Sequence, residues 1–406
     1  MKNKIINVGF VINYRLDGWL GVTYYYKNLF KTILDQENSQ IKIFIITDFH
    51  MSEDEKNEFK GIKIIQTNLV NRRSRFYRLM NIFSILLFGK NFLLEAFLIK
   101  NNIDIISHTN SLGCRSKVPS IKWIPDFQEI HFPGNFSKKL KLIRRLGVYF
   151  AEKHSTRILL SAETVRNDLK KINTKAAKKS SVLYYYTNLD SNTPFLGKER
   201  LIEKYAINKN YFYVPNHFWK HKNHLCIYKA VKKLKNKNIS INIVTTGERN
   251  DYRSPGYNTF LDNYVTKNNL EDNIQHLGII PMNDVYALVK SSIAVINASF
   301  FEGWGTTVEH ARFFNKEVIV SSLDIHLEQY NHHKSQKIHQ EHNKKKCFFF
   351  NPNKYEELSK IILKLNENKK NVVDTDNQDH FLNHKIVIKK FYENFLKIIK
   401  ESTNLN

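Results

Sequence analysis

One segment of the sequence combines glycines, hydroxyls and acids in a spacing that suits phosphate and sugar binding. Residues 299–310 read SFFEGWGTTVEH and follow an apolar, strand-like run. Gly303 and Gly305 let the backbone turn sharply, and we expect a helix to begin near Thr306. The unpaired N–H groups and positive dipole end of that helix would favour a diphosphate, with the hydroxyls of Thr306 and Thr307 as further donors.

Three titratable side chains stand in the same segment. Glu302 lies on the predicted loop, whereas Glu309 and His310 lie one turn inside the predicted helix. A carboxylate beside a phosphate site can accept hydrogen bonds from sugar hydroxyls, which are neutral and are not repelled by it. The alternative is an ordinary capped helix with Glu302 as a solvated loop residue. Spacing alone leaves both interpretations open, because glycine turns before helices are common.

The elements that would position these residues alternate in type along the chain. Apolar runs typical of buried strands are separated by longer segments with apolar residues at helical spacing. The predicted strands are 4–12, 41–47, 62–66, 103–107, 121–124, 157–160, 181–185, 211–215, 240–246, 274–277, 293–297, 317–321 and 346–350. The predicted helices are 22–34, 75–99, 138–152, 162–171, 222–236, 256–268, 282–290, 306–314 and 353–366. This alternation predicts an α/β fold with parallel sheets covered by helices on both faces.

The length of 406 residues favours two such domains, each doubly wound. Residues 188–208 are polar and contain Pro194 and Gly197, which makes them the best candidate for a linker. Residues 382–401 form an amphipathic stripe that predicts a final helix. The segment 331–346 is predicted to be a polar surface loop. Its histidines could be metal ligands, but nothing nearby fixes their geometry.

Several sequence features restrict where the protein acts. Three cysteines lie far apart, which suits a reducing compartment and predicts a cytoplasmic protein. The N-terminal apolar run ends at Asn13 without a cleavage site of small residues, so we interpret it as a first strand rather than a signal peptide. The most apolar window, 79–99, is interrupted by Lys90 and Glu95 and falls short of a membrane span.

The charge is strongly positive, with 63 Lys and Arg against 38 Asp and Glu, a formal net charge of +25. Clusters of Arg and Lys at 72–78 and 138–145 adjoin apolar segments. This combination suits an anionic membrane surface. Nucleic acid is the competing partner, but no nucleic-acid-binding motif accompanies the charge, and we expect no such partner. The third alternative is a set of solvated faces that reflects composition alone.

The run FEGWGTTVEHAR at 301–312, followed by KEVIVSSLDIH at 316–326, resembles the signature of glycosyltransferase family 4 (group 1). Members of that family have the GT-B fold, in which two Rossmann-like domains flank a cleft. The resemblance implies an acceptor-binding domain at 1–190, a domain at 205–380 that binds the nucleotide-sugar donor, and a helix at 381–406 that returns to the first domain. It covers nearly the whole chain and is strongest from 211 to 330.

The resemblance also implies roles for individual residues. The run PNHFWKHKNH at 215–224 is similar to the strand-end segment whose basic residues grip the donor diphosphate. The implied donor-binding residues are Gly21, Asn216, His217, Lys220, Lys222, Gly303, Trp304, Gly305, Thr306, Thr307, Glu309 and His310. Glu302, Lys222 and Asp126 are the implied catalytic residues, and Trp19 and His131 the acceptor-binding ones. Asp126 could instead cap a turn after Pro125, and a lone histidine such as His131 is often structural.

Two departures from the family pattern matter. The pattern has a second glutamate at the position of His310, and Glu309 is one residue short of it, about 100° away around a helix. A neutral His310 could still accept one hydrogen bond from a ribose hydroxyl. Val22 stands where many relatives have a second glycine, so Gly21 alone would allow close approach of the diphosphate.

The resemblance implies a retaining transfer of a hexose, with mannose as one candidate, to a lipid-linked or cell-surface glycan acceptor in polysaccharide biosynthesis. Lys222 and the helix N-terminus would stabilise the leaving diphosphate in place of a metal, and no cofactor is expected. The Asp-x-Asp at 374–376 is badly placed for a metal site. The alternative is a catalytically impaired GT-B homologue that acts as a partner or scaffold of an active transferase, suggested by His310.

Overall fold

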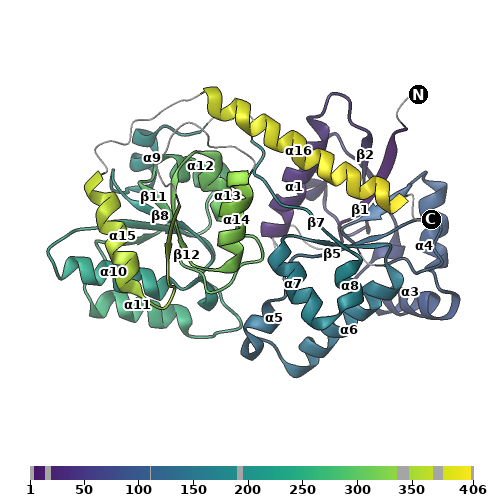
Figure 1. Ribbon diagram of the computed structural model, residues 1–406, viewed down its shortest axis with the longest axis horizontal. Helices are drawn as coiled ribbons and strands as arrows, with labels where there is room; N and C mark the ends of the chain where they lie inside the picture. Colours follow the sequence, from purple (N-terminus) through teal and green to yellow (C-terminus); the bar gives the residue numbers. More distant parts are fainter. Residues whose placement is uncertain are drawn as a thin grey trace. The chain divides into compact units, whose positions relative to one another are not determined.

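The structure, a computed structural model, describes most of the chain and divides it into two compact units. The described residues are 4–13, 20–109, 111–189, 195–335, 347–368 and 378–403. The first unit comprises Met1–Asn188 and Ile388–Asn406, and the second comprises Leu189–Val387. Each unit has a parallel sheet with helices around it (Figure 1). The predicted α/β fold with two parallel-sheet domains is thereby confirmed.

The first unit contains two parallel sheets, with strand orders β3-β2-β1-β4 and β5-β6-β7. A parallel bridge between Ile106 and Ser120 connects the two sheets. The strands are β1 (Ile6–Val11), β2 (Ile41–Thr47), β3 (Lys63–Gln66), β4 (Ile105–Ser107), β5 (Ile121–Ile124), β6 (Arg157–Leu160) and β7 (Ser180–Val182). The helices are α1 (Leu20–Leu34), α2 (Glu53–Asn57), α3 (Arg75–Phe88), α4 (Phe92–Lys100), α5 (Gln128–His131), α6 (Lys138–His154), α7 (Glu163–Ile172) and α8 (Thr174–Lys178).

The second unit has one parallel sheet with the strand order β10-β9-β8-β11-β12-β13. This is the order of a doubly wound nucleotide-binding sheet. The strands are β8 (Phe212–Pro215), β9 (Ile243–Thr246), β10 (Ile274–His276), β11 (Ala294–Asn297), β12 (Glu317–Ser321) and β13 (Cys347–Phe350). The helices are α9 (Lys198–Tyr205), α10 (His224–Lys235), α11 (Tyr257–Lys267), α12 (Met282–Ser291), α13 (Thr306–Phe313), α14 (Asp324–Ser335) and α15 (Tyr355–Glu367).

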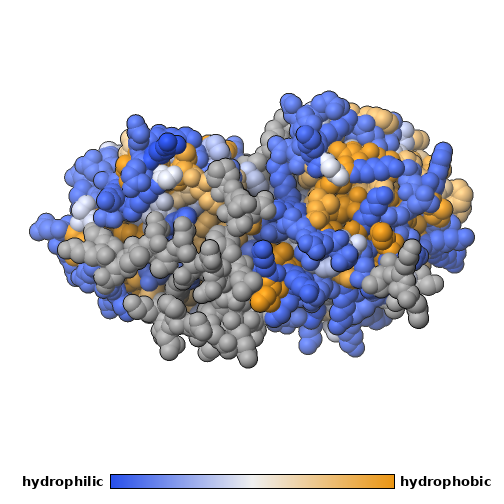
Figure 2. All heavy atoms as spheres, turned by 90° about the horizontal axis from the view of Figure 1, so that it is seen from above, coloured by the Kyte–Doolittle hydropathy of each residue, from blue (hydrophilic) through white to orange (hydrophobic). Residues whose placement is uncertain are grey.

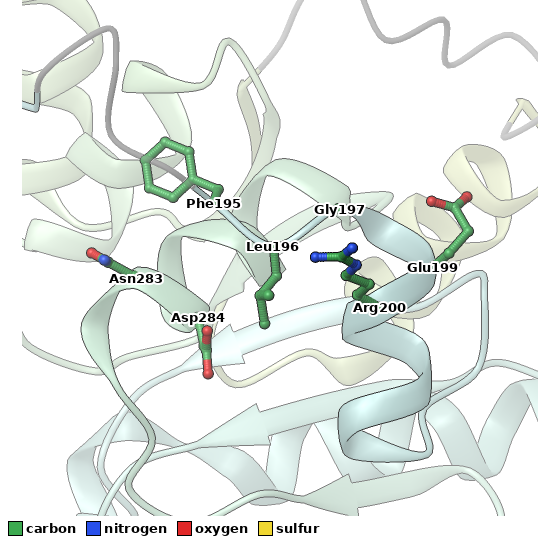
Figure 3. A pocket seen from close by; sticks show the side chains of 7 residues that line it. All are labelled: Phe195, Leu196, Gly197, Glu199, Arg200, Asn283 and Asp284. Atoms are coloured by element: carbon green, nitrogen blue, oxygen red, sulfur yellow. The ribbon is translucent and has the colours of Figure 1, made fainter.

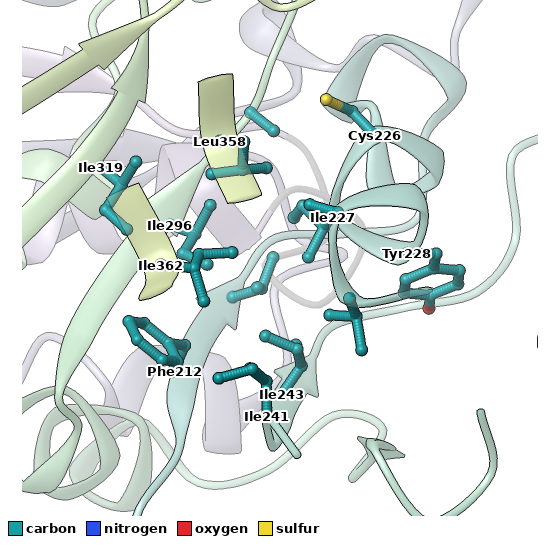
Figure 4. Packing of buried hydrophobic residues seen from close by; sticks show 14 of the residues in the cluster. Phe212, Cys226, Ile227, Tyr228, Ile241, Ile243, Ile296, Ile319, Leu358 and Ile362 are labelled. Carbon is teal, nitrogen blue, oxygen red and sulfur yellow. The ribbon is translucent and has the colours of Figure 1, made fainter. Parts of the chain in front are cut away.

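Both faces of the second sheet are buried, because successive strand residues point to opposite faces. On β8, Phe212 packs with α10 and α15, and Figure 4 shows its ring beside Ile296 and Ile362. Tyr213, the next residue, packs in the cluster on the other face with Val244 and Val295. These strands are apolar at nearly every position because both faces of the sheet are covered by packed side chains.

The predicted helix 75–99 is wrong as a single helix. The structure breaks it into α3 and α4, which are bent by 98° relative to each other. Gly89 ends α3 with a φ of 73°, a left-handed conformation that glycine adopts without strain. Asn91 then begins α4 by accepting a hydrogen bond from the backbone N of Leu94. The apolar periodicity of the sequence continues across the break. The glycine at position 89 and the helix-capping asparagine at position 91 were therefore not interpreted as a helix end and a helix start.

Two other predicted loops contain helices. Residues 198–205 of the predicted linker form α9, whose Leu201 is buried. Helix α14 extends to Ser335, into the predicted loop 331–346. The rest of that loop, Trp19 and the Asp-x-Asp at 374–376 lie outside the described residues. Helix α9 has only 8 residues and α14 is mostly polar, so neither has a clear apolar periodicity in the sequence.

The C-terminal helix α16 (Gln378–Thr403) begins four residues before the predicted helix start, and the units divide between Val387 and Ile388. Within the first unit, the hydroxyl of Tyr392 accepts a hydrogen bond of 2.7 Å from the backbone N of Gln40. Phe395 is fully buried, with its ring centroid 6.3 Å from that of Phe10. The last two-thirds of this helix therefore belong to the core of the first unit.

Hydrophobic side chains gather on part of the surface of the first unit, surrounded by hydrophilic residues (Figure 2). No single helix in the described part of the chain is long and apolar enough to cross a bilayer, whereas α3 and α4 pass that test together as a bent pair, by length and composition only. The three cysteines are free thiols.

Candidate functional site

The predicted donor-binding segments of the second unit meet at the carboxyl ends of β8 and β11. These strands are neighbours in the sheet, with Val295 beside Tyr213, although two other strands, β9 and β10, lie between them in the chain. The chain leaves β8 toward α10 on one face of the sheet and leaves β11 toward α13 on the other face. Such a switch point is where open parallel sheets bind ligands.

Lys222 and Glu302 form a close ion pair at this point. The Lys222 Nζ lies 2.7 Å from Oε1 and 2.9 Å from Oε2 of Glu302, although 80 residues separate them. The side chains are only 13% and 9% exposed. Lys222 was predicted to bind the diphosphate of the donor and Glu302 its sugar. The two side chains are thus in direct contact with each other.

Further donors hold the Glu302 carboxylate in place. Ser299 Oγ donates to Oε1 at 2.7 Å, and Asn297 Nδ2 donates to the same oxygen at 3.1 Å. Burial alone would raise the pKa of Glu302, but the Lys222 charge and the hydrogen bonds from Lys222 and Ser299 lower the pKa to about 2. Glu302 is therefore an ionised acceptor of fixed orientation, as an anchor for sugar hydroxyls needs to be.

The backbone around Lys222 is fixed by buried polar contacts. Lys222 ends a short 3-10 helix, and Asn223 follows it in the left-handed region with a φ of 59°. The amide of Asn223 donates to the carbonyl oxygens of Ala298 and Pro352, at 3.0 and 2.9 Å. The backbone N of Phe300 donates to the His221 carbonyl oxygen at 2.8 Å. These bonds join the segment after β8 to the segment after β11.

Glycines shape the loops as the sequence predicted. Gly305 has a φ of 83° and directly precedes α13, which begins at Thr306, where we expected the helix to begin. Gly247, after β9, has a φ of 122°, and a Cβ there would lie 2.8 Å from backbone atoms of Asn216 and His217. Both positions therefore require glycine for the conformation of the protein itself, before any ligand is considered.

The N-terminal turn of α13 offers polar groups near the Lys222–Glu302 ion pair. Thr306 is exposed, whereas Thr307 is buried, with its Oγ1 3.4 Å from the Asn216 side-chain oxygen. The Asn216 Nδ2 is buried without a hydrogen-bond partner in the described part of the chain. Gly303 is partly exposed and Trp304 is buried. A buried amide donor and a helix N-terminus together can receive an anion.

Glu309 and His310 turn to different neighbours, as adjacent helix positions must. Glu309 Oε1 accepts a 3.0 Å hydrogen bond from Gln329 Nε2 of α14. Burial raises the pKa of Glu309 even though Arg312 and Gln329 oppose that shift. The His310 ring packs edge-on to Tyr286 of α12 at 5.1 Å, and burial lowers the pKa of His310 to about 4. His310 is therefore neutral at physiological pH.

Two residues near the same turn were not assigned a role from the sequence. His326 Nδ1 lies 2.8 Å from the Ser321 carbonyl oxygen, so this nitrogen carries the proton and Nε2 is the acceptor. The Nε2 is buried without a hydrogen-bond partner in the described residues, as is Gln329 Oε1. Both atoms lie within 3.6 Å of the position of a Cβ on Gly305. Their sequence signals are that both follow β12 and that His326 ends the run 316–326 of the family resemblance.

An aromatic and basic stack flanks the segment after β8. The His217 and Trp219 rings stack with centroids 5.4 Å apart, and the Arg253 guanidinium lies 4.8 Å from the Trp219 centroid. Asp251 accepts a 2.8 Å hydrogen bond from the backbone N of Lys220, whose side chain is exposed. Burial, and then the nearby Lys222 charge, lower the pKa of His217. The stack gives this edge a flat, positively charged lining.

The predicted residues of the first unit lie in a different setting. Gly21 falls in the first turn of α1 rather than in a loop, and neither packing nor backbone angle requires glycine there. The Asp126 carboxylate accepts from the backbone N of Gln128 at 3.2 Å, which is the turn-capping arrangement. His131 Nε2 lies 2.6 Å from Asp168 Oδ2. Asp126 and His131 thus have structural contacts of their own.

Two other features of the described chain lie apart from these residues. No group of three or more His, Cys, Asp or Glu side chains among the described residues is arranged to hold a metal ion. A cavity of about 650 Å³ is lined by Phe195, Leu196, Gly197, Glu199, Arg200, Asn283 and Asp284 (Figure 3). None of these is a predicted site residue, and Asp284 is already bound by Lys204 and Tyr205.

Solved structures similar to this chain include glycosyltransferases. A glycosyltransferase from Rickettsia africae ESF-5 is similar over 98% of each chain, with 17% identity and a TM-score of 0.67. Anabaena HepE, solved in complex with UDP and glucose, is similar over 97% of this chain and 99% of its own, with 13% identity and a TM-score of 0.67. S. aureus TarM, solved with UDP among other ligands, is similar over 97% of this chain and 99% of its own, with 12% identity and a TM-score of 0.61.

The sequence comparison identifies the family through the second unit. A comparison with curated proteins gives no match. Residues 197–379, which span the sheet of the second unit and every predicted donor-binding residue except Gly21, match the model of the family described as glycosyl transferases group 1. The fold is the GT-B fold of the structures above. Through its second unit, the chain is therefore similar to the group 1 family of glycosyl transferases.

Proposed function

We propose that the protein is a retaining glycosyltransferase that transfers a hexose from a nucleoside-diphosphate sugar to a lipid-linked or cell-surface glycan acceptor. The observation that carries this proposal is the Lys222–Glu302 pair at the switch point, beside the N-terminus of α13. One cation for a diphosphate and one ionised carboxylate for sugar hydroxyls are the two groups that a nucleotide sugar requires.

The reaction we propose breaks the bond between the anomeric carbon and a diphosphate oxygen and forms a bond from that carbon to the oxygen of an acceptor hydroxyl. The leaving diphosphate takes the electron pair of the broken bond and the proton of the hydroxyl. Negative charge develops on the leaving diphosphate, and Lys222 with the N–H groups at Thr306 and Thr307 would stabilise it without a metal. Glu302 and the acceptor nitrogen of His326 would hold sugar hydroxyls. Neutral His310 would accept a hydrogen bond from a ribose hydroxyl, at the position where the family pattern has a glutamate.

The donor base and the acceptor follow from weaker observations. HepE and TarM are solved with UDP, which supports a uridine nucleotide as the first donor to test, with glucose and mannose among the hexoses. We further propose a role in polysaccharide biosynthesis, such as that of an O-antigen or a capsule, at the cytoplasmic face of the membrane. The net charge of +25 supports that placement, because lipid-linked acceptors and anionic lipids share this surface.

The test is a thermal-shift panel of UDP, GDP, ADP and CMP, followed by the sugar conjugates of the nucleotide that binds. A ligand that binds only the native state raises its stability by about 2.7 kcal/mol at a hundredfold excess over Kd. We expect one nucleotide to stabilise the protein at elevated salt as well as at low salt. A folded protein that responds to none of the four would contradict the proposal and favour the partner or scaffold function instead.

A further inference from the structure

Helix α3 carries its apolar side chains on the face exposed to solvent. Its most exposed hydrophobic residues include Phe76, Leu79, Phe83, Leu86 and Leu87, which are 69%, 54%, 57%, 60% and 72% exposed. Their spacing places them along one stripe of the helix. A stripe of this kind normally faces a protein core, and here it faces outward.

The face of α3 that contacts the protein combines polar side chains with the buried Ile85. Asn81 Nδ2 donates to the Leu69 carbonyl oxygen, and Ser84 Oγ donates to the Lys90 carbonyl oxygen, both at 2.9 Å. Ile85 is the one buried residue of this helix. Helix α3 therefore exposes more apolar surface than an ordinary surface helix, and the packing of the first unit gives no reason for its outer face.

Helices α4 and α6 also expose apolar side chains, although each buries apolar residues too: Leu94 and Leu98 on α4, and Val148 and Ala151 on α6. On α4, Glu95 is buried and paired with Lys90 Nζ at 2.6 Å, whereas Phe92, Leu93 and Ile99 are exposed. The exposed apolar residues of α6 are Leu140, Leu142, Ile143, Leu146 and Tyr149. We call the exposed apolar residues of these three helices the α3–α4–α6 surface. Figure 1 shows all three helices in the first unit.

A short segment joins the three helices at one place. The backbone N of Arg115 donates to the Gly89 carbonyl oxygen, at the corner between α3 and α4, at 2.9 Å. Two residues earlier, the backbone N of Gly113 donates at 3.0 Å to the carbonyl oxygen of His154, the last residue of α6. The end of α3, the start of α4 and the end of α6 are therefore neighbours.

The exposed charge around this surface is mostly basic; the nearby acids are Glu152 on α6 and the Asp126 and Glu129 carboxylates, which pair with Arg144. The exposed basic residues are Arg72, Arg73, Arg75, Arg78 and Lys100 next to α3 and α4, and Lys138, Lys139 and Arg145 on α6. Between residues 71 and 100 the single acid is Glu95, which is buried, and residues 138–149 contain no acid. The partner of this surface must therefore accept both apolar side chains and an excess of positive charge.

We infer that the α3–α4–α6 surface docks on an anionic phospholipid bilayer. The acyl region takes up the Phe and Leu side chains while the headgroups bind the Arg and Lys side chains. A second copy of this chain would bring the same positive charge to the interface, and a nucleic acid would offer nothing to the apolar stripe. Helix α3 has 14 residues, about 21 Å, so it lies within the interface rather than crossing a core of about 30 Å.

The experiment is flotation of the full chain with vesicles of phosphatidylcholine, with and without phosphatidylglycerol. We expect the protein to float with the anionic vesicles. Leu79→Ser/Phe83→Ser/Leu86→Ser should reduce binding at least tenfold, and Arg75→Gln/Arg78→Gln should reduce it about fivefold per arginine. The matched control is Phe49→Ser/Phe260→Ser, two exposed phenylalanines outside this surface, which should float like the unchanged protein.

Three outcomes would overturn the inference. The chain could fail to float with anionic vesicles, the triple variant could float as well as the unchanged protein, or the surface could hold two copies together, which sedimentation would reveal as a dimer that the triple variant loses. A Phe83→Trp variant gives a measurement without loss of the surface: brominated acyl chains should quench its fluorescence more than that of Phe260→Trp. The UDP thermal shift of each variant separates a failure of docking from a failure of donor binding.

Discussion

At the scale of single residues, the Lys222–Glu302 pair has different consequences for donor binding and for turnover. Without a donor, each charge neutralises the other at 2.7 Å. A diphosphate approaching Lys222 therefore meets a carboxylate close by, and the two anions repel each other. Glu302 would be retained because it positions the sugar, not because it helps to bind the nucleotide.

We therefore predict that Glu302→Gln lowers turnover while it tightens UDP binding about fivefold or more. The amide keeps the shape and one acceptor oxygen, but it loses the charge that competes for Lys222. Calorimetric titration with UDP and steady-state kinetics with the sugar donor measure the two effects separately. Weaker UDP binding by this variant would mean that Glu302 contacts the donor in another way than we propose.

Lys222→Ala should have the opposite effect on binding. Loss of a charge-assisted contact to the diphosphate costs about 1.5–3 kcal/mol, which corresponds to roughly a tenfold to hundredfold rise in the Kd for UDP. Lys267→Ala removes an equal charge from the exposed face of α11 and serves as the control. If both variants bind UDP equally well, Lys222 does not contact the donor.

His310 is suited to its surroundings as a neutral side chain. It is 7% exposed, packs on Tyr286, and follows the buried Glu309. His310→Glu restores the family pattern but adds a second carboxylate to a buried place. We predict that it destabilises the protein by about 1–3 kcal/mol, whereas His310→Gln keeps a neutral acceptor and the affinity for the nucleotide. Thermal unfolding and UDP titration of both variants check this. A fully stable, more active His310→Glu variant would show that the histidine is a degraded glutamate.

At the scale of elements, the corner between α3 and α4 depends on Gly113. A Cβ at this residue would lie 2.2 Å from the Gly89 carbonyl oxygen, and its φ of 109° is strained for other residues. Gly61 has a φ of 89° but open space around it, so a substitution there measures the cost of backbone strain without the cost of a steric clash. We predict that Gly61→Ala costs about 1 kcal/mol and Gly113→Ala at least about 3 kcal/mol in the free energy of unfolding, measured by denaturant titration. Equal losses would contradict the close contact.

The last helix should be a stability element of the first unit. Phe395 of α16 is fully buried between Phe10 and His108, with ring centroids 6.3 and 5.9 Å away. We predict that Phe395→Ala costs about 3–5 kcal/mol, because it leaves a cavity in a packed core. Ile386→Ala, on an exposed position of the same helix, should change little. Similar unfolding of the two variants would mean that α16 does not contribute to the core.

At the scale of the whole molecule, buried neutral histidines make the protein sensitive to acid. Burial lowers the pKa of His108, His221 and His224 to about 3 and that of His310 to about 4, from an ordinary value of 6.5. Above pH 6.5 neither state binds these protons. Below it the unfolded chain binds them and the folded chain does not, so stability falls. Protonation of Glu302 lowers the stability of the folded protein only as the pH drops from 4.5 toward the pKa of this residue, about 2.

We predict that the melting temperature falls steadily between pH 6.5 and 4, and each such histidine contributes about 1.4 kcal/mol per pH unit. His224→Phe should flatten this dependence, because its ring already stacks on Phe218 at 4.0 Å and needs no charge. Calorimetric scans across this range decide the point, and a flat profile for the unchanged protein would contradict it.

Much of the fold could be predicted from the sequence because its signals are local. Buried parallel strands need apolar runs, and helices between them need apolar periodicity, so the order of elements follows from the chain alone. The glycine turn before Thr306 and the run 299–310 are also local, and they were enough to predict the helix start and the Glu302 loop. The break at Gly89 was missed because an apolar pattern continued through it.

What only the tertiary structure decided is which distant residues meet. Lys222 pairs with Glu302 across 80 residues because β8 and β11 are neighbours in the sheet, and no periodicity states strand order. The same holds for His326 beside Gly305. The outward apolar face of α3 is the clearest case, since its sequence reads as a core helix and only the packing of Asn81 and Ser84 reveals which side faces the protein. Sequence patterns specify the polarity of each element, and packing specifies where each face points.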